Sequence, residues 1–443
     1  MLRRLTMLCG LLLIFQLAAK AQSPALADIR TGKKIMDGFM DLRFGMFIHW
    51  GPVTLKGTEI GWSRGTEVPA AEYDSLYKRF DPVHFDATAW VKAAKDAGMK
   101  YLTITAKHHD GFCLWPSDYT TYDIASTPFR KDVVGALAKA CREQGVKFCI
   151  YYSVLDWHHP DYPIHNPVNT HNTNDSILDP KADMKKYIVY MKNQLKELIT
   201  RYHPYMLWFD GDWEIPWTND EAVDMYRYIK SIDRQVIINN RLGADDNHGV
   251  LDDRSIGDYA TPEQVIGTIN MKDPWESCIT ICRQWAWKPN DELKSLKECM
   301  DILAGTAGGN GNLLLNISPM PDGRIETRQT ERLKEIGAWM KKYGAAIYKT
   351  QGGPYKPNRH FTSTRRGNKV NILLLQRPDG ALSLASIPGC KVQKAYFMGG
   401  APVKYSQDEK GIHLTLPSSL PDKNCSVIVL EMDKDVANVP LID

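Results

Sequence analysis

The chain has 443 residues, of which 43% are hydrophobic and 24% are charged, as is usual for a globular protein. These proportions exclude a disordered, collagen-like or coiled-coil chain. The net charge is +3, but the first 21 residues hold three basic side chains and no acidic one, so the rest of the chain is neutral. A nucleic-acid-binding protein needs a basic surplus to neutralise phosphates, so we expect no nucleic-acid partner.

The N-terminus has the features of a secretory signal peptide. Arg3 and Arg4 precede an apolar stretch over residues 5–18, and residues 19–21 match a cleavage site. We therefore predict a signal peptide over residues 1–21 and export of the mature chain to the periplasm or the cell exterior. A membrane anchor is the alternative, but the apolar stretch is shorter than the roughly 20 residues that span a bilayer.

Between about residue 41 and residue 343, short apolar segments alternate with amphipathic ones. Continuous apolar strands between helices indicate a parallel sheet covered on both faces, and eight of them fit a (β/α)8 barrel. An open doubly wound sheet is disfavoured, because no Gly-rich fingerprint follows the first strand. The predicted strands are residues 44–50, 101–106, 147–152, 205–209, 235–239, 255–259, 276–281 and 312–316; the predicted helices are 89–98, 132–145, 183–202, 221–233, 291–305 and 327–343.

The pattern changes after residue 348. Short strands follow at 370–374, 381–384, 395–397, 411–416 and 426–430, with turn residues between them, and no tryptophan occurs after Trp339. This pattern is typical of a small all-β domain, which we interpret as a sandwich. We therefore predict an α/β chain with a (β/α)8-like catalytic domain over residues 22–346 and a C-terminal β-sandwich over residues 347–443.

Cysteines are too few to define a disulfide scaffold, although export would permit disulfides. Cys278 and Cys282 are four residues apart on a predicted strand, which is a poor arrangement for a zinc site. We interpret them as small apolar residues of the core, with a disulfide as the alternative.

Polar side chains beside tryptophans gather where the predicted strands end. Active sites of such barrels lie at the C-terminal ends of the strands. Sugars need directional hydrogen bonds for their hydroxyls and aromatic faces for their C–H surfaces, so this pattern favours a carbohydrate site. The candidate contacts are His49, Glu59, Trp62, His108, His109, Tyr152 and Trp213.

Two carboxylates would carry out the chemistry of a glycosidase, one as nucleophile or base and the other as acid. Asp210 follows the apolar residues 206–209, so we expect it to point into the barrel mouth; Asp212 and Glu214 compete with it. Glu276 adjoins Trp275, where burial would raise its pKa and suit an acid. Glu263 is a second candidate for that role. The other interpretation of Glu276 is a buried structural residue paired with an arginine.

The neighbouring His108 and His109 have both a metal and a substrate-binding interpretation. Adjacent residues of a strand point to opposite faces, so both could bind one ion only through a bulge. We therefore favour hydrogen bonding to substrate and expect no metal.

Several segments, in this order, resemble the α-L-fucosidases of glycoside hydrolase family 29. They are FGMFIHWG at 44–51, KHHDGF at 107–112, YYS at 151–153 with Asp156-Trp157, WFDG at 208–211, WESC at 275–278 and NLLLNISP at 312–319. The resemblance implies a barrel plus a β-sandwich, no cofactor or metal, and a retaining mechanism with Asp210 as nucleophile.

The same resemblance assigns the remaining roles. It places the acid/base on Glu276 and contacts to fucose on His49, His108, His109, Tyr152 and Trp213. Glu59 and Trp62 resemble the family's Glu-Trp loop, although two residues separate them here. We therefore expect an exo-acting enzyme that removes terminal α-L-fucose from a fucosylated oligosaccharide or glycoconjugate. The alternatives are a barrel glycosidase for another sugar and a catalytically silent carbohydrate-binding protein.

Overall fold

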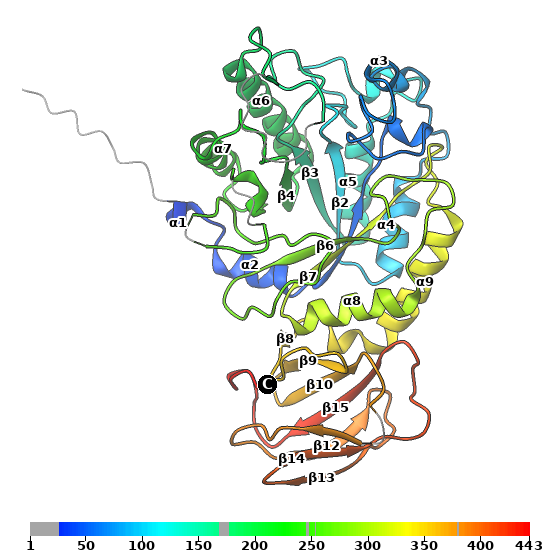
Figure 1. Ribbon diagram of the computed structural model, residues 1–443, viewed down its shortest axis with the longest axis vertical. Coiled ribbons are helices and arrows are strands. Elements are labelled where there is room, and N and C mark those ends of the chain that lie inside the picture. Colours follow the sequence, from blue (N-terminus) through cyan, green and yellow to red (C-terminus); the bar gives the residue numbers. More distant parts are fainter. Residues whose placement is uncertain (1–25, 168–176, 245–247, 253, 379–380) are drawn as a thin grey trace, which may run out of the picture.

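The computed structural model describes residues 26–167, 177–244, 248–252, 254–378 and 381–443. The predicted signal peptide lies outside these residues. None of the helices described is both long and apolar enough to cross a membrane. A parallel α/β part is followed by antiparallel sheets (Figure 1), so the predicted fold class is confirmed.

Seven parallel strands form the wall of the barrel, in the spatial order β5-β4-β3-β2-β1-β7-β6. They match seven of the eight strands predicted from the apolar pattern. Nearly every residue in them is buried, because the sheet is covered on both faces. Their bounds are β1 Phe44–Ile48, β2 Tyr101–Lys107, β3 Lys147–Ser153, β4 Met206–Asp210, β5 Ile237–Ile238, β6 Glu276–Thr280 and β7 Asn312–Ile317.

The prediction of a sixth strand at residues 255–259 is wrong. Isolated parallel bridges close the barrel between β5 and β6 instead, joining Tyr259 to Asn239, Ala260 to Trp275 and Glu263 to Cys278. Pro262 has no N–H to donate, and proline is excluded from regular ladders for that reason. The segment 259–263 therefore crosses the gap without forming a continuous strand.

Helices surround the strands (Figure 1), and the six predicted ones are present, five of them with shifted ends. Local signals explain several of these ends: Asp132 accepts from the backbone N–H of Gly135 at the start of α5, and Gly145 ends that helix in the left-handed conformation. The bounds are α1 Leu26–Ile29, α2 Lys33–Met40, α3 Ala70–Tyr73, α4 Ala87–Asp96, α5 Val133–Gln144, α6 Met184–Tyr202, α7 Asn219–Ile232, α8 Leu296–Gly308 and α9 Thr327–Tyr343.

The barrel interior is filled by side chains rather than open. Large aromatic residues from alternate positions of the strands pack together with Phe39 of α2. Gly45 of β1 lies opposite Tyr101 of β2, and a Cβ at Gly45 would overlap the tyrosine ring. The eight cysteines described are all free and buried, which confirms the interpretation of Cys278 and Cys282 as core residues.

The C-terminal strands form two antiparallel sheets with one shared apolar core. The sheet orders are β12-β15-β10-β9-β8 and β11-β14-β13. The pattern missed three strands, β8, β9 and β13, which are short or largely polar. The bounds are β8 Gln351–Gly352, β9 Phe361–Arg366, β10 Lys369–Leu374, β11 Ala381–Leu384, β12 Val392–Phe397, β13 Lys404–Asp408, β14 Gly411–Thr415 and β15 Ser426–Met432.

These sheets pack beneath α8 and α9 (Figure 1). The indole of Trp339 on α9 donates to the carbonyl of Cys425 at 2.9 Å, and the hydroxyl of Thr364 donates to the carbonyl of Ala346 at 2.6 Å. Buried bonds between the two parts fix the sheets to the side of the barrel away from the strand ends that carry the site.

We expect Gly45→Ala to lower the free energy of unfolding by about 1–3 kcal/mol, because the added methyl group would displace the buried Tyr101 ring. Gly38→Ala in α2 is the matched control: this position is exposed, with nothing within 4 Å of an added Cβ, and alanine should stabilise the helix by about 0.5–1 kcal/mol. Denaturant unfolding of both variants measures the two effects. Equal stability of the two variants would contradict the close packing of Gly45 against Tyr101.

Candidate active site

A cavity of about 80 Å³ opens at the C-terminal ends of the barrel strands. Its lining comes from strand ends and from the turns that follow them, so chain segments far apart in the sequence meet there. The lining residues are Phe47, His49, Trp62, His108, His109, Tyr151, Trp208, Asp210, Trp213, Arg241, Glu263, Cys278 and Trp285.

Asp210 is the last residue of β4 and points into this cavity, as predicted. Its Oδ2 accepts from the hydroxyl of Tyr151 at 3.0 Å and lies 3.6 Å from Nε2 of His109. Burial alone would raise the pKa of Asp210, but the positive charge of Arg241 and the neighbouring His109 outweigh burial and lower it. The carboxylate is therefore held ionised in a largely dry site.

Arg241 connects Asp210 with Glu263. One guanidinium nitrogen, NH1, lies 2.9 Å from Oδ1 of Asp210 and 2.8 Å from Oε2 of Glu263. The two carboxylate oxygens can therefore be no farther apart than the sum of these distances, about 5.7 Å. The guanidinium also donates to the hydroxyl and carbonyl of Thr261, each at 3.0 Å, which ties the segment carrying Glu263 to the end of β4.

Three predicted histidines line the cavity and are held neutral. Burial lowers the pKa of His49 to about 3 and that of His109 to about 4, and it places the pKa of His108 well below its ordinary value. Nδ1 of His49 lies 2.7 Å from Oδ1 of Asn316, and Nδ1 of His109 lies 2.6 Å from the hydroxyl of Ser153. Neutral imidazoles can both donate to and accept from sugar hydroxyls.

The expectation that His108 and His109 face opposite sides is wrong. Both follow the end of β2 at Lys107, where the pairing with β3 shifts register, and the N–H of Gly111 donates back to the carbonyl of His108. This turn brings the two ring centroids within 4.1 Å of each other. Even so, across the ranges that the structure describes, no group of three or more His, Cys, Asp or Glu side chains could hold a metal ion.

Tryptophans form the rim. Trp62 and Trp213 are stacked, with ring centroids 5.9 Å apart and planes 17° from parallel. Trp285 lies against His49 at 4.7 Å. Nε1 of Trp213 and Nδ1 of His108 are buried and have no hydrogen-bond partner among the residues described. Buried polar groups normally have partners, so these two are available to a ligand.

Tyr152 does not face the cavity, which corrects its predicted contact with substrate. Its hydroxyl donates to Gln194 at 2.8 Å on the outer side of β3, where the Lys107 ammonium lies over its ring. The preceding residue, Tyr151, lines the cavity instead. Alternation along a strand requires that only one of the two point inward.

Glu276 does not lie at the barrel mouth, which corrects the expectation for the acid. It is the first residue of β6, at the opposite end of the barrel, and it is fully buried. Its carboxylate accepts from the hydroxyls of Tyr101 and Tyr259 and from the indole of Trp208. Burial raises its pKa to about 7, but no substrate in the cavity can reach it, and the arginine partner considered for it is absent from these contacts.

Three other carboxylates hold loops in place. Glu59, predicted to contact substrate, accepts from the backbone N–H groups of Ile60, Trp285 and Ala286 and does not line the cavity. Both oxygens of Asp212 contact Nε2 of His248, at 3.0 and 2.9 Å. The carboxylate of Glu214 accepts from the side chains of Trp157 and Tyr162. Neither Asp212 nor Glu214 therefore replaces Asp210.

Sequence reasoning gave no site role to Arg241, Tyr151 or Trp208. A signal was present for Arg241, which lies two residues after the predicted fifth strand. Tyr151 and Trp208 lie within strands, and only the phase of the alternation shows which neighbours point inward.

Close carboxylates in a cavity walled by tryptophans are the arrangement that cleaves glycosidic bonds. Together with the position of the cavity at the C-terminal ends of the barrel strands, this arrangement places the chain among the barrel-type glycoside hydrolases.

Comparison with known proteins identifies the family. The sequence model described as Alpha-L-fucosidase matches residues 14–345, and the chain belongs to that family. Alpha-L-fucosidase isoenzyme 1 from Paenibacillus thiaminolyticus is 34% identical, with a TM-score of 0.83 over 90% of this chain and 99% of that one. A GH29 alpha-L-fucosidase from Bacteroides thetaiotaomicron, trapped as a covalent intermediate with 2-fluoro-fucosyl fluoride, is 30% identical, with a TM-score of 0.80 over 91% and 97%. Human tissue alpha-L-fucosidase is 28% identical over 86% of this chain and 85% of its own.

We expect Tyr151→Phe to lower kcat/KM for a chromogenic α-L-fucoside by about 10- to 100-fold, because it removes a hydrogen bond to the ionised Asp210. Tyr152→Phe is the matched control on the other face of β3; it loses only the bond to Gln194 and should keep kcat/KM within about threefold while lowering thermal stability. Steady-state kinetics and melting temperatures separate the two. A larger kinetic effect at Tyr152 would contradict the orientation of β3.

Proposed function

We propose that this chain is an exo-acting, retaining α-L-fucosidase that releases terminal α-L-fucose by double displacement. The observation that supports it most is the shared contact of Asp210 and Glu263 with one nitrogen of Arg241, which keeps their oxygens within about 5.7 Å. Retaining glycosidases hold their two carboxyl groups roughly 5–5.5 Å apart, whereas inverting enzymes leave about 6.5–9.5 Å for a water. The covalent intermediate of the Bacteroides relative supports the same mechanism.

In the first step, Asp210 attacks the anomeric carbon of fucose while protonated Glu263 donates its proton to the departing glycosidic oxygen. The bond to the leaving sugar breaks, and a β-linked fucosyl ester of Asp210 forms. In the second step, the Glu263 carboxylate takes a proton from water, and that water displaces Asp210 to give α-L-fucose. The lowered pKa of Asp210 suits a nucleophile, and the 40% exposure of the Glu263 side chain leaves it accessible to water.

The lining of the cavity supports the binding of a single terminal sugar ring. The three neutral histidines supply hydrogen bonds around that ring, and Trp62 with Trp213 offers apolar surface at the rim. A barrel glycosidase for another sugar and a silent binding protein remain the alternatives, and hydrolysis of a panel of aryl glycosides distinguishes all three.

Export through the signal peptide at residues 1–21 is part of this proposal. It rests on the basic, apolar and small residues in that order at the N-terminus. N-terminal sequencing of enzyme recovered outside the cytoplasm should begin at Gln22, and an intact leader in cytoplasmic enzyme would contradict export.

We expect Asp210→Ala to lower kcat by about 10⁴-fold or more, as removal of a catalytic nucleophile does. Azide should restore part of the activity with an activated aryl fucoside, because it can enter the space left by the carboxylate and form β-fucosyl azide. Circular dichroism checks that the variant is folded. Full activity without azide would show that another carboxylate is the nucleophile.

We expect Glu263→Ala to slow substrates with poor leaving groups by about 10²–10⁴-fold, because they need protonation, and to slow activated aryl fucosides much less. Glu276→Gln is the matched control: it should lower stability without this dependence on the leaving group, since Glu276 lies at the other end of the barrel. Plots of kcat/KM against the pKa of the leaving group for both variants test the assignment. A strong dependence for Glu276→Gln and none for Glu263→Ala would identify Glu276 as the acid.

The anomer of the product tests retention directly. The first fucose signal seen by NMR during hydrolysis should be the α-anomer, followed by slow mutarotation. If β-fucose comes first, Asp210 acts as a general base on water rather than as a nucleophile.

A further inference from the structure

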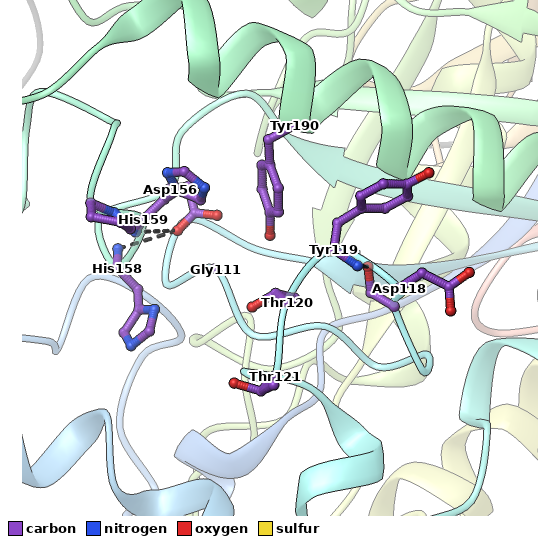
Figure 2. Close-up of a pocket in the computed structure, with 11 residues that line it drawn as sticks. Gly111, Asp118, Tyr119, Thr120, Thr121, Asp156, His158, His159 and Tyr190 are labelled. Carbon is purple, nitrogen blue, oxygen red and sulfur yellow. Dashed lines mark hydrogen bonds between the residues drawn. The ribbon is translucent and has the colours of Figure 1, made fainter.

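A second and larger cavity, about 550 Å³, lies at the same end of the barrel (Figure 2). Its walls come from the loop after β2, the turn after β3 and Tyr190 of α6. It shares none of its lining residues with the active-site cavity, and nothing in the proposed hydrolysis uses it.

The two cavities lie on opposite sides of the same turns. His109 lines the active-site cavity, and its carbonyl accepts from the N–H of Trp157 at 2.9 Å. The neighbours of these residues, Gly111 and Asp156 with His158, line the second cavity. The two cavities are therefore neighbours, separated by these turns.

Hydrogen bonds and an ion pair within the protein fix the walls of the second cavity in the absence of a ligand. Asp156 accepts from the N–H groups of His158 and His159, and Lys107 lies 3.3 Å from its other oxygen. Glu197 of α6 holds the opposite loop by accepting from the side chains of Trp115 and Ser117 and from the N–H of Asp118. Preformed walls lower the cost of ordering on binding.

Gly111 keeps the base of the cavity open. It has a φ of +78°, which favours glycine. A Cβ at this position would overlap the carboxylate of Asp156. The turn can therefore form only with a residue that has no side chain.

The lining is polar and contains no lysine or arginine side chain. A phosphate or sulfate group therefore has no counter-charge there. Its two carboxylates, Asp118 and Asp156, are paired with Arg201 and Lys107. What remains are hydroxyl and imidazole groups, which bind neutral hydroxyls by hydrogen bonds.

The hydroxyls of Thr120 and Thr121 turn toward the side where His158 lies (Figure 2), and the Thr120 hydroxyl already accepts from the N–H of Tyr122 at 3.0 Å. The ring nitrogens of His158 and the hydroxyl of Thr121 have no hydrogen-bond partner in the described parts of the chain. Tyr119 at the rim presents a ring that is 45% exposed, which suits the C–H face of a sugar.

We propose that this cavity binds a neutral sugar unit of the substrate glycan, other than the fucose that is cleaved. The inference rests on the proposed function, because the second sugar belongs to the same substrate. It predicts that the enzyme recognises the glycan beyond the scissile bond and prefers oligosaccharides that reach over the His109–Trp157 turns.

The test compares Thr121→Trp, which fills the cavity, and His158→Ala, which removes an imidazole stacked on Tyr122, with the wild type. We expect kcat/KM for the best substrate in a panel of fucosylated oligosaccharides to fall about tenfold through KM, as the loss of one or two hydrogen bonds implies. An aryl α-L-fucoside has no second sugar, so its kcat/KM should stay within about twofold. Thr88→Trp, at an exposed threonine of α4 outside both cavities, is the matched control and should change neither substrate.

Binding of the defucosylated oligosaccharide to the intact protein gives an independent measurement. Saturation-transfer NMR should show contacts in the wild type and in Thr88→Trp, and lose them in Thr121→Trp. Unchanged kinetics for every oligosaccharide, or equal losses with oligosaccharide and aryl fucoside, would overturn the proposal. A wild type inactive on the aryl fucoside would instead contradict the proposed hydrolysis, and the NMR result would still decide whether the cavity binds sugar.

Discussion

The contact of Arg241 with both Asp210 and Glu263 is the interaction on which the rest of the site depends. Holding a buried carboxylate close to a second one is costly unless a positive charge lies between them. The Arg241 guanidinium supplies that charge, lies over the ring of Trp208 at 4.9 Å, and is anchored to Thr261. Because Asp210 ends β4 and Glu263 lies in the segment that closes the barrel, one side chain sets the separation of two groups from distant parts of the chain.

The segment that closes the barrel therefore also carries one of the two site carboxylates. The segment 259–263 bridges β5 and β6 by isolated pairs only, and such a segment has little stability of its own. Buried Asp258 anchors its start, accepting from Thr31 and Tyr226 and pairing with Lys230. An irregular segment fixed at both ends can place Glu263 partly in solvent, as an acid that exchanges protons with water requires, whereas a regular strand would alternate its side chains between two buried faces.

The apolar pattern predicted the fold well, because a parallel strand covered on both faces is nearly uniform in hydrophobicity, as β2 to β4 show. It failed where pairing is isolated, at 255–259, and where strands are polar, as in β13. In the site, Asp210 was predictable because it lies at the C-terminal end of its strand. Glu276 begins its strand, so chain direction alone places it at the far end of the barrel. The choice between Tyr151 and Tyr152 needs the phase of β3, which a uniformly apolar strand does not reveal.

Asp210 and Glu276 show why residue type and burial do not identify a catalytic acid. Burial acts on both carboxyl groups in the same direction and is the largest influence on each. Asp210 faces a guanidinium and an imidazole, so its pKa falls below the ordinary value. Glu276 faces only neutral hydroxyl and indole donors, so its pKa rises to about 7. A raised pKa in a glycosidase therefore signals an acid only where substrate can reach the proton, and at the base of this barrel it marks a carboxyl group that holds three aromatic side chains in place.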